Sequence, residues 1–329
     1  MFLRNTWYVA AWAGEVGDGL LGRRILDEPV LLYRDSTGTV AAIGDRCPHR
    51  FAPLHLGRKI GDTVQCGYHG LIFGTDGRCL TRLRSGTLPE GAHVKAYPLA
   101  EKYGLLWIWM GDRARATAES IPDLAFLAQE AVGAVDGYLH IRAAYELALD
   151  NLMDLSHAAF LHEETLGRLT PALCDGNLEV LRDGERIVAA MQMPGVELNG
   201  IEGRVDQWLD MTWNPPSVTI LDIGHVPAGA PRTGHGRRAI HIVTPETEQS
   251  SHYFFRNAAN RTGFKRDPFR DEDEPMLAAC QSMMGSQDFW DLKPVILPGD
   301  AGAVLVRHRL KRLIHEESAR HSGATADSG

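Results

Sequence analysis

The chain has 329 residues, 44% apolar and 23% charged, which suits a folded protein of about two domains. This composition excludes a wholly disordered chain, a collagen and a coiled coil. The 34 basic and 42 acidic residues give a formal net charge of −8, which is not the basic surface expected of a protein that binds nucleic acid or an anionic membrane.

The sequence carries no obvious membrane or export signal. No apolar run approaches the roughly 18 residues of a membrane helix, and the segment 103–110 is typical of a buried strand. Because no basic stretch followed by an apolar core opens the chain, we expect a cytoplasmic protein. The odd count of five cysteines then favours metal ligands over a disulfide framework.

The first third of the chain is predicted to be a domain made of strands. Short runs rich in β-branched and aromatic residues are separated by Gly- and Asp-rich turns, which is typical of an all-β sandwich or barrel. The runs are residues 7–12, 29–33, 39–43 and 105–110. We place the end of this domain after Asp112.

Residues 113–318 are predicted to form a second, α+β domain. A helix over 143–162 comes first, then strands, then helices over 273–292 and 301–317. The expected strands cover 186–193, 217–226, 237–243 and 251–256. Residues 319–329 are small and polar and are expected to be a disordered tail.

The first predicted domain contains a Cys-x-His motif and a Cys-x-x-His motif with sixteen residues between them. Cys47 and Cys66 can hold one iron of a two-iron, two-sulfide cluster, while His49 and His69 hold the other. Neutral imidazoles in place of two thiolates raise the reduction potential of such a cluster.

A zinc knuckle with the same four ligands is the alternative to this cluster, although zinc sites more often contain Cys-x-x-Cys halves. The remaining cysteines are expected to be buried small hydrophobic residues or inert thiols. His55 is expected to be a loop or surface histidine rather than a fifth ligand.

The second predicted domain contains two histidines that could bind a metal. His157 and His162 are five residues apart, so on an ideal helix they would point about 140° away from each other. The helix must therefore distort, or His162 must lie at its end. Two imidazoles and a carboxylate would make a facial triad, with Asp288 or Asp291 as the carboxylate. The alternative is two hydrogen-bonded histidines at the edge of the core.

Together these motifs resemble the oxygenase component of the Rieske non-haem iron oxygenases, in the vanillate and dicamba O-demethylase branch. The motifs that carry the resemblance are Cys47-Pro-His-Arg50, Cys66-Gly-Tyr-His-Gly70, Asp150-Asn-Leu-Met-Asp-Leu-Ser-His157 with His162, Asn5-Thr-Trp-Tyr-Val-Ala10 and Thr244-Pro-Glu-Thr247. The resemblance implies an all-β Rieske [2Fe-2S] domain followed by a helix-grip α+β catalytic domain.

The resemblance also implies which residues bind the metals. Cys47, His49, Cys66 and His69 would hold the cluster. His157 and His162 would hold a mononuclear Fe(II), with the third ligand best placed on Asp288.

Family members commonly form head-to-tail homotrimers, so the cluster of one subunit feeds the iron of the next. Asp154, three residues before His157, would bridge the neighbour's His69 and its own His157 as a catalytic residue. Its protonation would then be linked to the redox state. Asn151 would lie beside the iron, or else be an ordinary helix-surface or capping amide.

The resemblance implies a monooxygenase that removes the methyl group of a small methoxylated aromatic acid as formaldehyde. Hydroxylation of a ring or alkyl carbon is the alternative, and a simple electron carrier would need only the first domain. The substrate pocket is expected to be lined by strands 217–226 and 237–243 and by the last helices, and its shape to depend on loops such as 196–210 and 227–236. His241 is a candidate for binding a substrate carboxylate or phenol, or else a hydrogen-bonded histidine of the sheet.

A separate NAD(P)H-dependent ferredoxin or flavin reductase is implied as a partner. The chain has no dinucleotide-binding Gly-x-Gly-x-x-Gly fingerprint that opens a helix, and no plant-type ferredoxin spacing of cysteines. Arg46, Arg50 and Arg58 near the cluster loops could form its docking patch, or simply a solvated loop surface.

Overall fold

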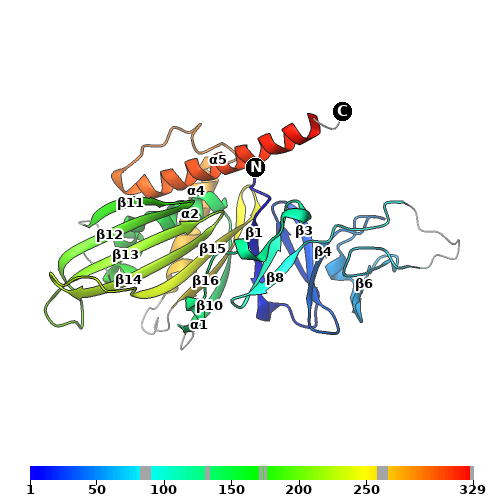
Figure 1. Ribbon diagram of the computed structural model, residues 1–329, viewed down its shortest axis with the longest axis horizontal. Coiled ribbons are helices and arrows are strands. Elements are labelled where there is room, and N and C mark those ends of the chain that lie inside the picture. Colours follow the sequence, from blue (N-terminus) through cyan, green and yellow to red (C-terminus); the bar gives the residue numbers. More distant parts are fainter. Residues whose placement is uncertain (82–89, 130–133, 170–172, 174–175, 258–265, 327–329) are drawn as a thin grey trace. The chain divides into compact units, whose positions relative to one another are not determined.

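The computed structural model describes residues 1–81, 90–129, 134–169, 173, 176–257 and 266–326 (Figure 1). The chain divides into two compact units, residues 2–121 and residues 122–329 together with Met1. The boundary predicted from the sequence lies after Asp112. Residues 113–121 contain short 3-10 turns that belong to the first unit, where the indole N–H of Trp7 donates a hydrogen bond to the carbonyl of Thr117 (2.8 Å).

The first unit consists of three small antiparallel sheets. Their strand orders are β1-β9-β8, β2-β3-β4 and β5-β6-β7. The strands are β1 Trp7–Trp12, β2 Leu21–Ile25, β3 Glu28–Arg34, β4 Val40–Gly44, β5 Arg58–Ile60, β6 Thr63–Gln65, β7 Ile72–Phe73, β8 Leu99–Lys102 and β9 Leu105–Trp109. Each of the four predicted strands corresponds to an observed one. Strands β1 and β9 are buried along their whole length because they pair in the middle of the apolar core.

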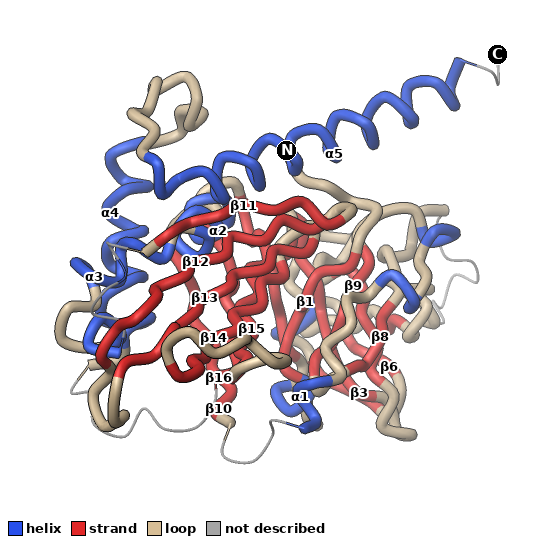
Figure 2. The backbone as a smooth tube through the Cα atoms, turned by 60° about the vertical axis from the view of Figure 1, so that its left-hand side comes forward, coloured by secondary structure: helices blue, strands red, loops and turns tan. Residues whose placement is uncertain are grey.

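The second unit is built on one seven-stranded antiparallel sheet with the order β10-β16-β15-β14-β13-β12-β11 (Figure 2). Its strands are β10 Val135–Ile141, β11 Asn177–Asp183, β12 Arg186–Glu197, β13 Arg204–Asn214, β14 Val218–Pro227, β15 Arg237–Thr247 and β16 Ser250–Asn257. Consecutive strands from β11 to β16 pair as a meander, and β10 adds to the edge beside β16. The mixed α+β architecture agrees with the fold class predicted from the sequence.

Helix α2 (Tyr145–Met153) packs against strands β13 and β15 and against helices α4 and α5. The other helices of this unit are α1 Phe126–Gln129, α3 Ala158–Leu161, α4 Glu274–Met284 and α5 Ala301–Ala326. A π-helical turn, Pro268–Asp273, leads directly into α4. Six of the nine residues of α2 are buried, so this helix is held by packing.

Three predicted helices have different bounds in the structure. The helix expected over 143–162 is broken at Asp154. The helix expected over 273–292 ends at Met284, because Gly285 adopts a positive φ of 61° and closes the last turn onto Gln281. The helix expected over 301–317 continues to Ala326, into the segment expected to be a disordered tail, where no proline stops it.

The loop 227–236 packs on the face of the sheet opposite to the core beneath the helices. Leu221 points into that core, whereas the next residue, Asp222, points the other way and accepts a hydrogen bond from the indole of Trp208 (3.0 Å). The guanidinium of Arg232 lies 4.3 Å from the centre of the same indole. The charged side chains of this loop therefore hold it to the outer face of the sheet.

Among the described residues, no helix is at once long and apolar enough to span a bilayer.

Candidate metal centres

The two cysteine motifs of the first unit fold into loops with the same backbone pattern. The residue four positions after each cysteine donates its N–H to the cysteine carbonyl, at 2.9 Å for Cys47 and 3.0 Å for Cys66. Each cysteine N–H in turn donates to the carbonyl five positions on, at 2.9 and 2.7 Å. Phe51 and Gly70 occupy equivalent places and both have positive φ, 60° and 76°. The chain therefore presents two matched turns.

These turns bring the four predicted cluster ligands together in two layers. The side chains of Cys47 and Cys66 are buried, and burial together with the neighbouring Cys66 raises the pKa of the Cys47 thiol. His49 and His69 are exposed, with their ring centres 4.5 Å apart. Inner thiols and outer imidazoles fit a cluster whose two irons have sulfur and nitrogen ligands, respectively.

His55 and Cys79 of the first unit have structural roles. The ring of His55 pairs with the buried carboxylate of Asp45, which also accepts the His55 backbone N–H (2.7 Å). Cys79 is buried in the apolar core, whereas Cys280 on α4 is exposed. Cys174 lies outside the described residues.

In the second unit, the break in the predicted helix is what brings the two histidines together. Helix α2 ends at Met153, and Asp154 adopts an extended backbone (φ −113°, ψ 95°). Its carboxylate then accepts the N–H of Ser156 (2.9 Å) and caps the 3-10 turn Leu155–His157. Helix α3 follows, with His162 at its C-terminal end. The two imidazoles consequently lie 5.2 Å apart, centre to centre.

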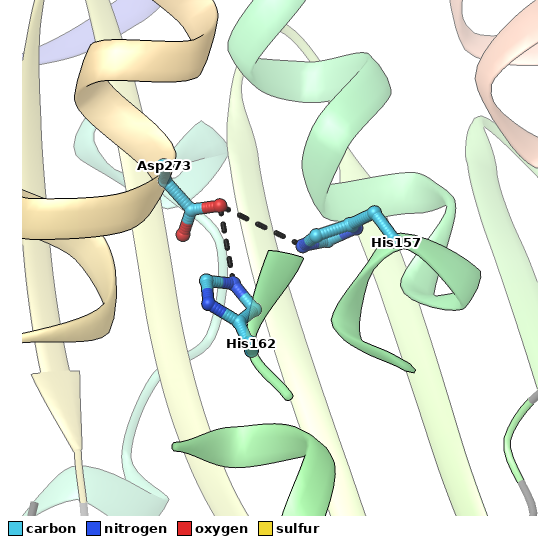
Figure 3. Close-up of side chains that lie close together, drawn as sticks. All are labelled: His157, His162 and Asp273. Atoms are coloured by element: carbon cyan, nitrogen blue, oxygen red, sulfur yellow. Dashed lines mark ion pairs between the residues drawn. The ribbon is translucent and has the colours of Figure 1, made fainter. Parts of the chain in front are cut away.

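A carboxylate completes this group, as Figure 3 shows. Asp273 Oδ1 lies 3.1 Å from His162 Nε2 and 3.7 Å from His157 Nε2, and all three candidate ligand atoms lie within 4.8 Å of one another. Metal–ligand bonds of about 2.1 Å separate neighbouring ligands by roughly 3 Å, so the donors fit one ion with little movement. Two histidines and one carboxylate are the donor set of a non-haem iron facial triad.

The surroundings of His157 and Asp273 orient their ligand atoms. His157 Nδ1 lies 2.6 Å from the Asp154 carbonyl and donates to it, which leaves Nε2 directed at Asp273. The amide of Asn151 donates to Asp273 Oδ1 (3.1 Å), so Asn151 lies at the site but contacts the carboxylate. Asp154 itself points its carboxylate towards Ser156 and the turn at Gly299.

Both the ring and the backbone of His162 are held by hydrogen bonds. Its Nδ1 lies 2.7 Å from Glu272, and its backbone carbonyl accepts the N–H groups of Thr165 and Gly167, both at 2.9 Å. Only 1% of the His162 side chain is exposed. Burial lowers the pKa of His162, but Asp273 and Glu272 outweigh it, so the net shift is upward. A cation at this position is therefore electrostatically favoured.

The structure places Asp273, not Asp288, beside the two histidines. The Asp288 carboxylate accepts the backbone N–H of Trp290 (2.9 Å), and the Asp288 carbonyl accepts the N–H of Asp291. Both residues belong to the turns after α4, and the expectation of either as the third ligand is corrected to Asp273. Helix α4 begins beside the two histidines. The carboxylate that lies there, Asp273, is therefore at the N-terminal end of the helix, whereas Asp288 and Asp291 follow its C-terminal end.

A usable signal for Asp273 was present in the sequence. Asp273 stands in the acidic run Asp271-Glu272-Asp273-Glu274, whereas Asp288 follows the neutral Gln287. The period of an ideal helix does not predict which way Glu272 and Asp273 point, because both lie in a π-helical turn, which shifts the register of side chains by a residue.

His241 on β15 lies on the sheet face that carries Tyr253 and is covered by the π-helical turn. It is 3% exposed, its Nδ1 lies 2.6 Å from the Tyr253 hydroxyl, and Phe269 meets its ring edge-on at 5.4 Å. Because Phe269 is four residues before Asp273, the His241 ring lies on the side of the sheet that faces the histidine–carboxylate group.

Comparisons with known families match both units. Residues 6–98 match the Rieske [2Fe-2S] domain, and residues 141–316 match the vanillate O-demethylase oxygenase C-terminal domain. The second match alone covers more than half of the chain. The two matches contain all the candidate ligands described above.

Individual relatives extend over nearly the whole chain. The oxygenase component of a chloroacetanilide N-alkylformylase from Rhizorhabdus wittichii is 37% identical, over 96% of this chain and 97% of the relative. The oxygenase component of dicamba O-demethylase from Stenotrophomonas maltophilia is 36% identical, over 97% and 99%. The crystal structure of dicamba monooxygenase bound to 3,6-dichlorosalicylic acid superimposes with a TM-score of 0.86 at 35% identity, covering 97% and 99%.

Proposed function

Because this chain belongs to the Rieske non-haem iron oxygenases, in the branch with the vanillate O-demethylase type of catalytic domain, we propose that it demethylates a small methoxylated aromatic acid. The enzyme class is an oxygenase component with a [2Fe-2S] cluster and a mononuclear iron. The observation that carries the proposal is the group of half-buried His157 with buried His162 and Asp273, in a chain that also has a Rieske domain.

The reaction consumes one O2, two electrons and two protons for each methoxy group. One oxygen atom enters the methyl C–H bond and gives a hemiacetal, and the other leaves as water. The hemiacetal then breaks its bond between the former methyl carbon and the phenolic oxygen, releasing formaldehyde and the phenol. When bound, the cluster would supply single electrons and the mononuclear iron would supply oxygen activation.

The side chains of this chain would hold the two metal centres and orient one of the ligands. Cys47, His49, Cys66 and His69 would hold the cluster, while His157, His162 and Asp273 would hold the mononuclear iron. Asn151 would fix the orientation of Asp273 through its 3.1 Å hydrogen bond.

Substrate recognition is assigned to the buried face near His241. The stacked Tyr253 ring and its hydroxyl hold the His241 imidazole, which would bind the carboxylate or phenol oxygen of the substrate. Phe255 and Phe269 beside it supply an apolar wall for an aromatic ring.

Metal analysis and product analysis test the proposal. Anaerobically purified protein should contain about three irons and two acid-labile sulfides per chain. The His157→Ala variant should lose only the third iron and keep the visible absorption of the cluster. With a methoxybenzoate and a partner reductase, formaldehyde should form in step with oxygen uptake. Zinc in place of the cluster would refute the proposal.

Oxidation of a different carbon is the second candidate function. It is favoured by the chloroacetanilide N-alkylformylase relative, which is as similar to this chain as dicamba O-demethylase is. The same iron site would then hydroxylate an alkyl or ring carbon of another small substrate. Stable hydroxylated products without formaldehyde would identify this activity.

Electrons must come from a separate reductase, since an oxygenase component works within a multi-component system. We assign its docking patch to the exposed Arg46, Arg50 and Arg58 around the cluster loops, where Phe51 and Leu56 add exposed apolar surface. Reversing these charges should slow cluster reduction in stopped-flow measurements, and added salt should reduce the difference between variant and wild type.

A further inference from the structure

We propose that Glu272 is a positioning residue of the mononuclear site: it fixes the tautomer and the ring orientation of His162. The inference rests on the proposed function and extends it to a residue that does not itself bind the metal. It follows from two hydrogen bonds within the second unit, which Glu272 accepts from His162 and from Thr165.

The contacts converge on one oxygen of one buried carboxylate. Glu272 Oε2 lies 2.7 Å from His162 Nδ1 and 2.7 Å from the hydroxyl of Thr165. His162, Thr165 and Glu272 are 1%, 2% and 8% exposed, so water competes little with these hydrogen bonds. A buried carboxylate needs such donors, and here both come from the segment that carries His162.

The pattern decides which ring nitrogen of His162 faces the metal. With the Thr165 hydroxyl donating to Oε2, the carboxylate is the acceptor, and His162 Nδ1 must be the second donor. Nε2 is then left with its lone pair, 3.1 Å from Asp273 Oδ1, where a metal would bind. A carboxylate behind a ligating imidazole also makes that imidazole a stronger donor.

His157 and His162 differ in the group that accepts a hydrogen bond from Nδ1. His157 donates its Nδ1–H to a neutral backbone carbonyl, that of Asp154, whereas His162 donates to an anionic side chain. Glu272 is also the neighbour of Asp273 in the π-helical turn Pro268–Asp273. The π-helical turn therefore positions both Asp273, the carboxylate ligand, and Glu272, which orients His162. Asp273 and Glu272 cannot move independently of each other.

A matched control is built into the chain on the other side of Asp273. Glu274 has the same charge as Glu272 and is likewise adjacent to Asp273 in the sequence. Its carboxylate, however, pairs with Arg142 (2.9 Å), an exposed side chain. Glu274→Gln therefore changes the charge next to Asp273 without touching His162.

The test measures cobalt binding to the full chain with the cluster in place and the mononuclear iron removed. Co(II) is titrated anaerobically against a competing chelator, and its electron paramagnetic resonance spectrum is recorded with the cluster oxidised, a state in which the cluster is silent. Wild type, Glu272→Gln, Glu272→Leu and Glu274→Gln are compared. Thermal unfolding checks that each variant is folded.

We expect Glu272→Leu to bind Co(II) about 10- to 100-fold more weakly than wild type, and with a changed spectrum. Glu272→Gln keeps an acceptor oxygen without the charge, so its affinity for Co(II) should lie between those of wild type and Glu272→Leu. Glu274→Gln should match wild type in affinity and spectrum. If Glu272→Leu does not fold, Glu272→Gln alone decides the question.

Wild-type affinity and spectrum in the folded Glu272 variants would overturn the inference and leave the proposed iron site intact. A different result would sink the iron site itself: no Co(II) bound to wild type, or no loss of binding on changing His157 to Ala. The two failures are thus distinguishable in one set of titrations.

Discussion

Gly167 lies where the chain after α3 returns to the backbone of His162. A Cβ atom at this position would lie 2.6 Å from the carbonyl oxygen of Ala158 and 2.9 Å from that of His162. Neither atom can move without displacing the helix that ends in His162. The absence of a side chain here is therefore part of how the histidine is positioned.

The Gly167→Ala variant should lose about 1–3 kcal/mol of unfolding free energy, because it overpacks backbone against backbone. It should also retain less mononuclear iron, since His162 must shift. Gly17→Ala, where a Cβ would meet nothing within 4 Å, is the control. Iron analysis and thermal unfolding check both, and full iron occupancy in Gly167→Ala would contradict the expectation.

Glu146 on α2 predicts a pH dependence of stability. Burial raises the pKa of this carboxyl from 4.5 to about 7, and the nearby Arg307 only partly offsets the effect. The folded chain thus holds a proton that the unfolded chain has released. The resulting stabilisation is present below about pH 4.5 and is lost as the pH rises to about 7, by at most about 3 kcal/mol.

The measurement compares wild type with Glu146→Gln, which cannot titrate. The melting temperature of the variant relative to wild type should rise between pH 5 and pH 8. Parallel pH profiles for the two proteins would show that Glu146 titrates at its ordinary pKa in the folded state.

At the scale of elements, helices α2 and α5 are joined by a bidentate ion pair. Arg307 donates from Nε and Nη2 to the carboxylate of Asp150, at 2.6 to 2.9 Å, and the two side chains are 11% and 23% exposed. The same guanidinium lies 4.0 Å from the ring centre of Phe289, in the segment after α4. The pair therefore connects three segments around the site.

Arg307→Met should cost about 3 kcal/mol of unfolding free energy, because it leaves the Asp150 carboxylate without its partner. Adding Asp150→Asn should restore part of that loss, so the double variant is more stable than the sum of the single changes predicts. Additive losses in chemical denaturation would show that the two residues act independently.

The break between α2 and α3 carries a second prediction. Asp154→Ala removes the cap of the turn Leu155–His157, which should cost about 1 kcal/mol, while Asp154→Asn keeps a capping oxygen. If Asp154 bridges the neighbour's His69 and its own His157, as the family resemblance implies, both variants should keep both metals and lose turnover. Near-normal oxygen-coupled activity in either variant would exclude the bridging role.

At the scale of the whole molecule, the head-to-tail trimer that the family resemblance implies predicts complementation between inactive chains. A His69→Ala chain lacks a cluster ligand and a His157→Ala chain lacks an iron ligand, so each is inactive alone. Mixed trimers would contain pairs in which an intact cluster serves the intact iron of the neighbour. Activity should therefore reappear on co-expression. An inactive mixture that is trimeric by light scattering would place electron transfer within one chain.

The motifs that act locally were predictable from the sequence. Each cluster loop is a turn of a few residues, so the spacing of Cys47, His49, Cys66 and His69 already determines which side chains can meet. The family resemblance likewise identified the enzyme class and the histidine pair, whose five-residue spacing required a break in the helix.

Only the tertiary structure decided which carboxylate lies beside the two histidines and which residue orients His162. Asp273 and Glu272 are far from His162 in the sequence and reach it through a π-helical turn that no regular period predicts. Asp288, chosen from sequence alone, lies instead in the turns after α4. Local spacing fixes partners within a few residues, whereas contacts between distant segments depend on how sheet and helices pack, and the packing is a property of the whole unit.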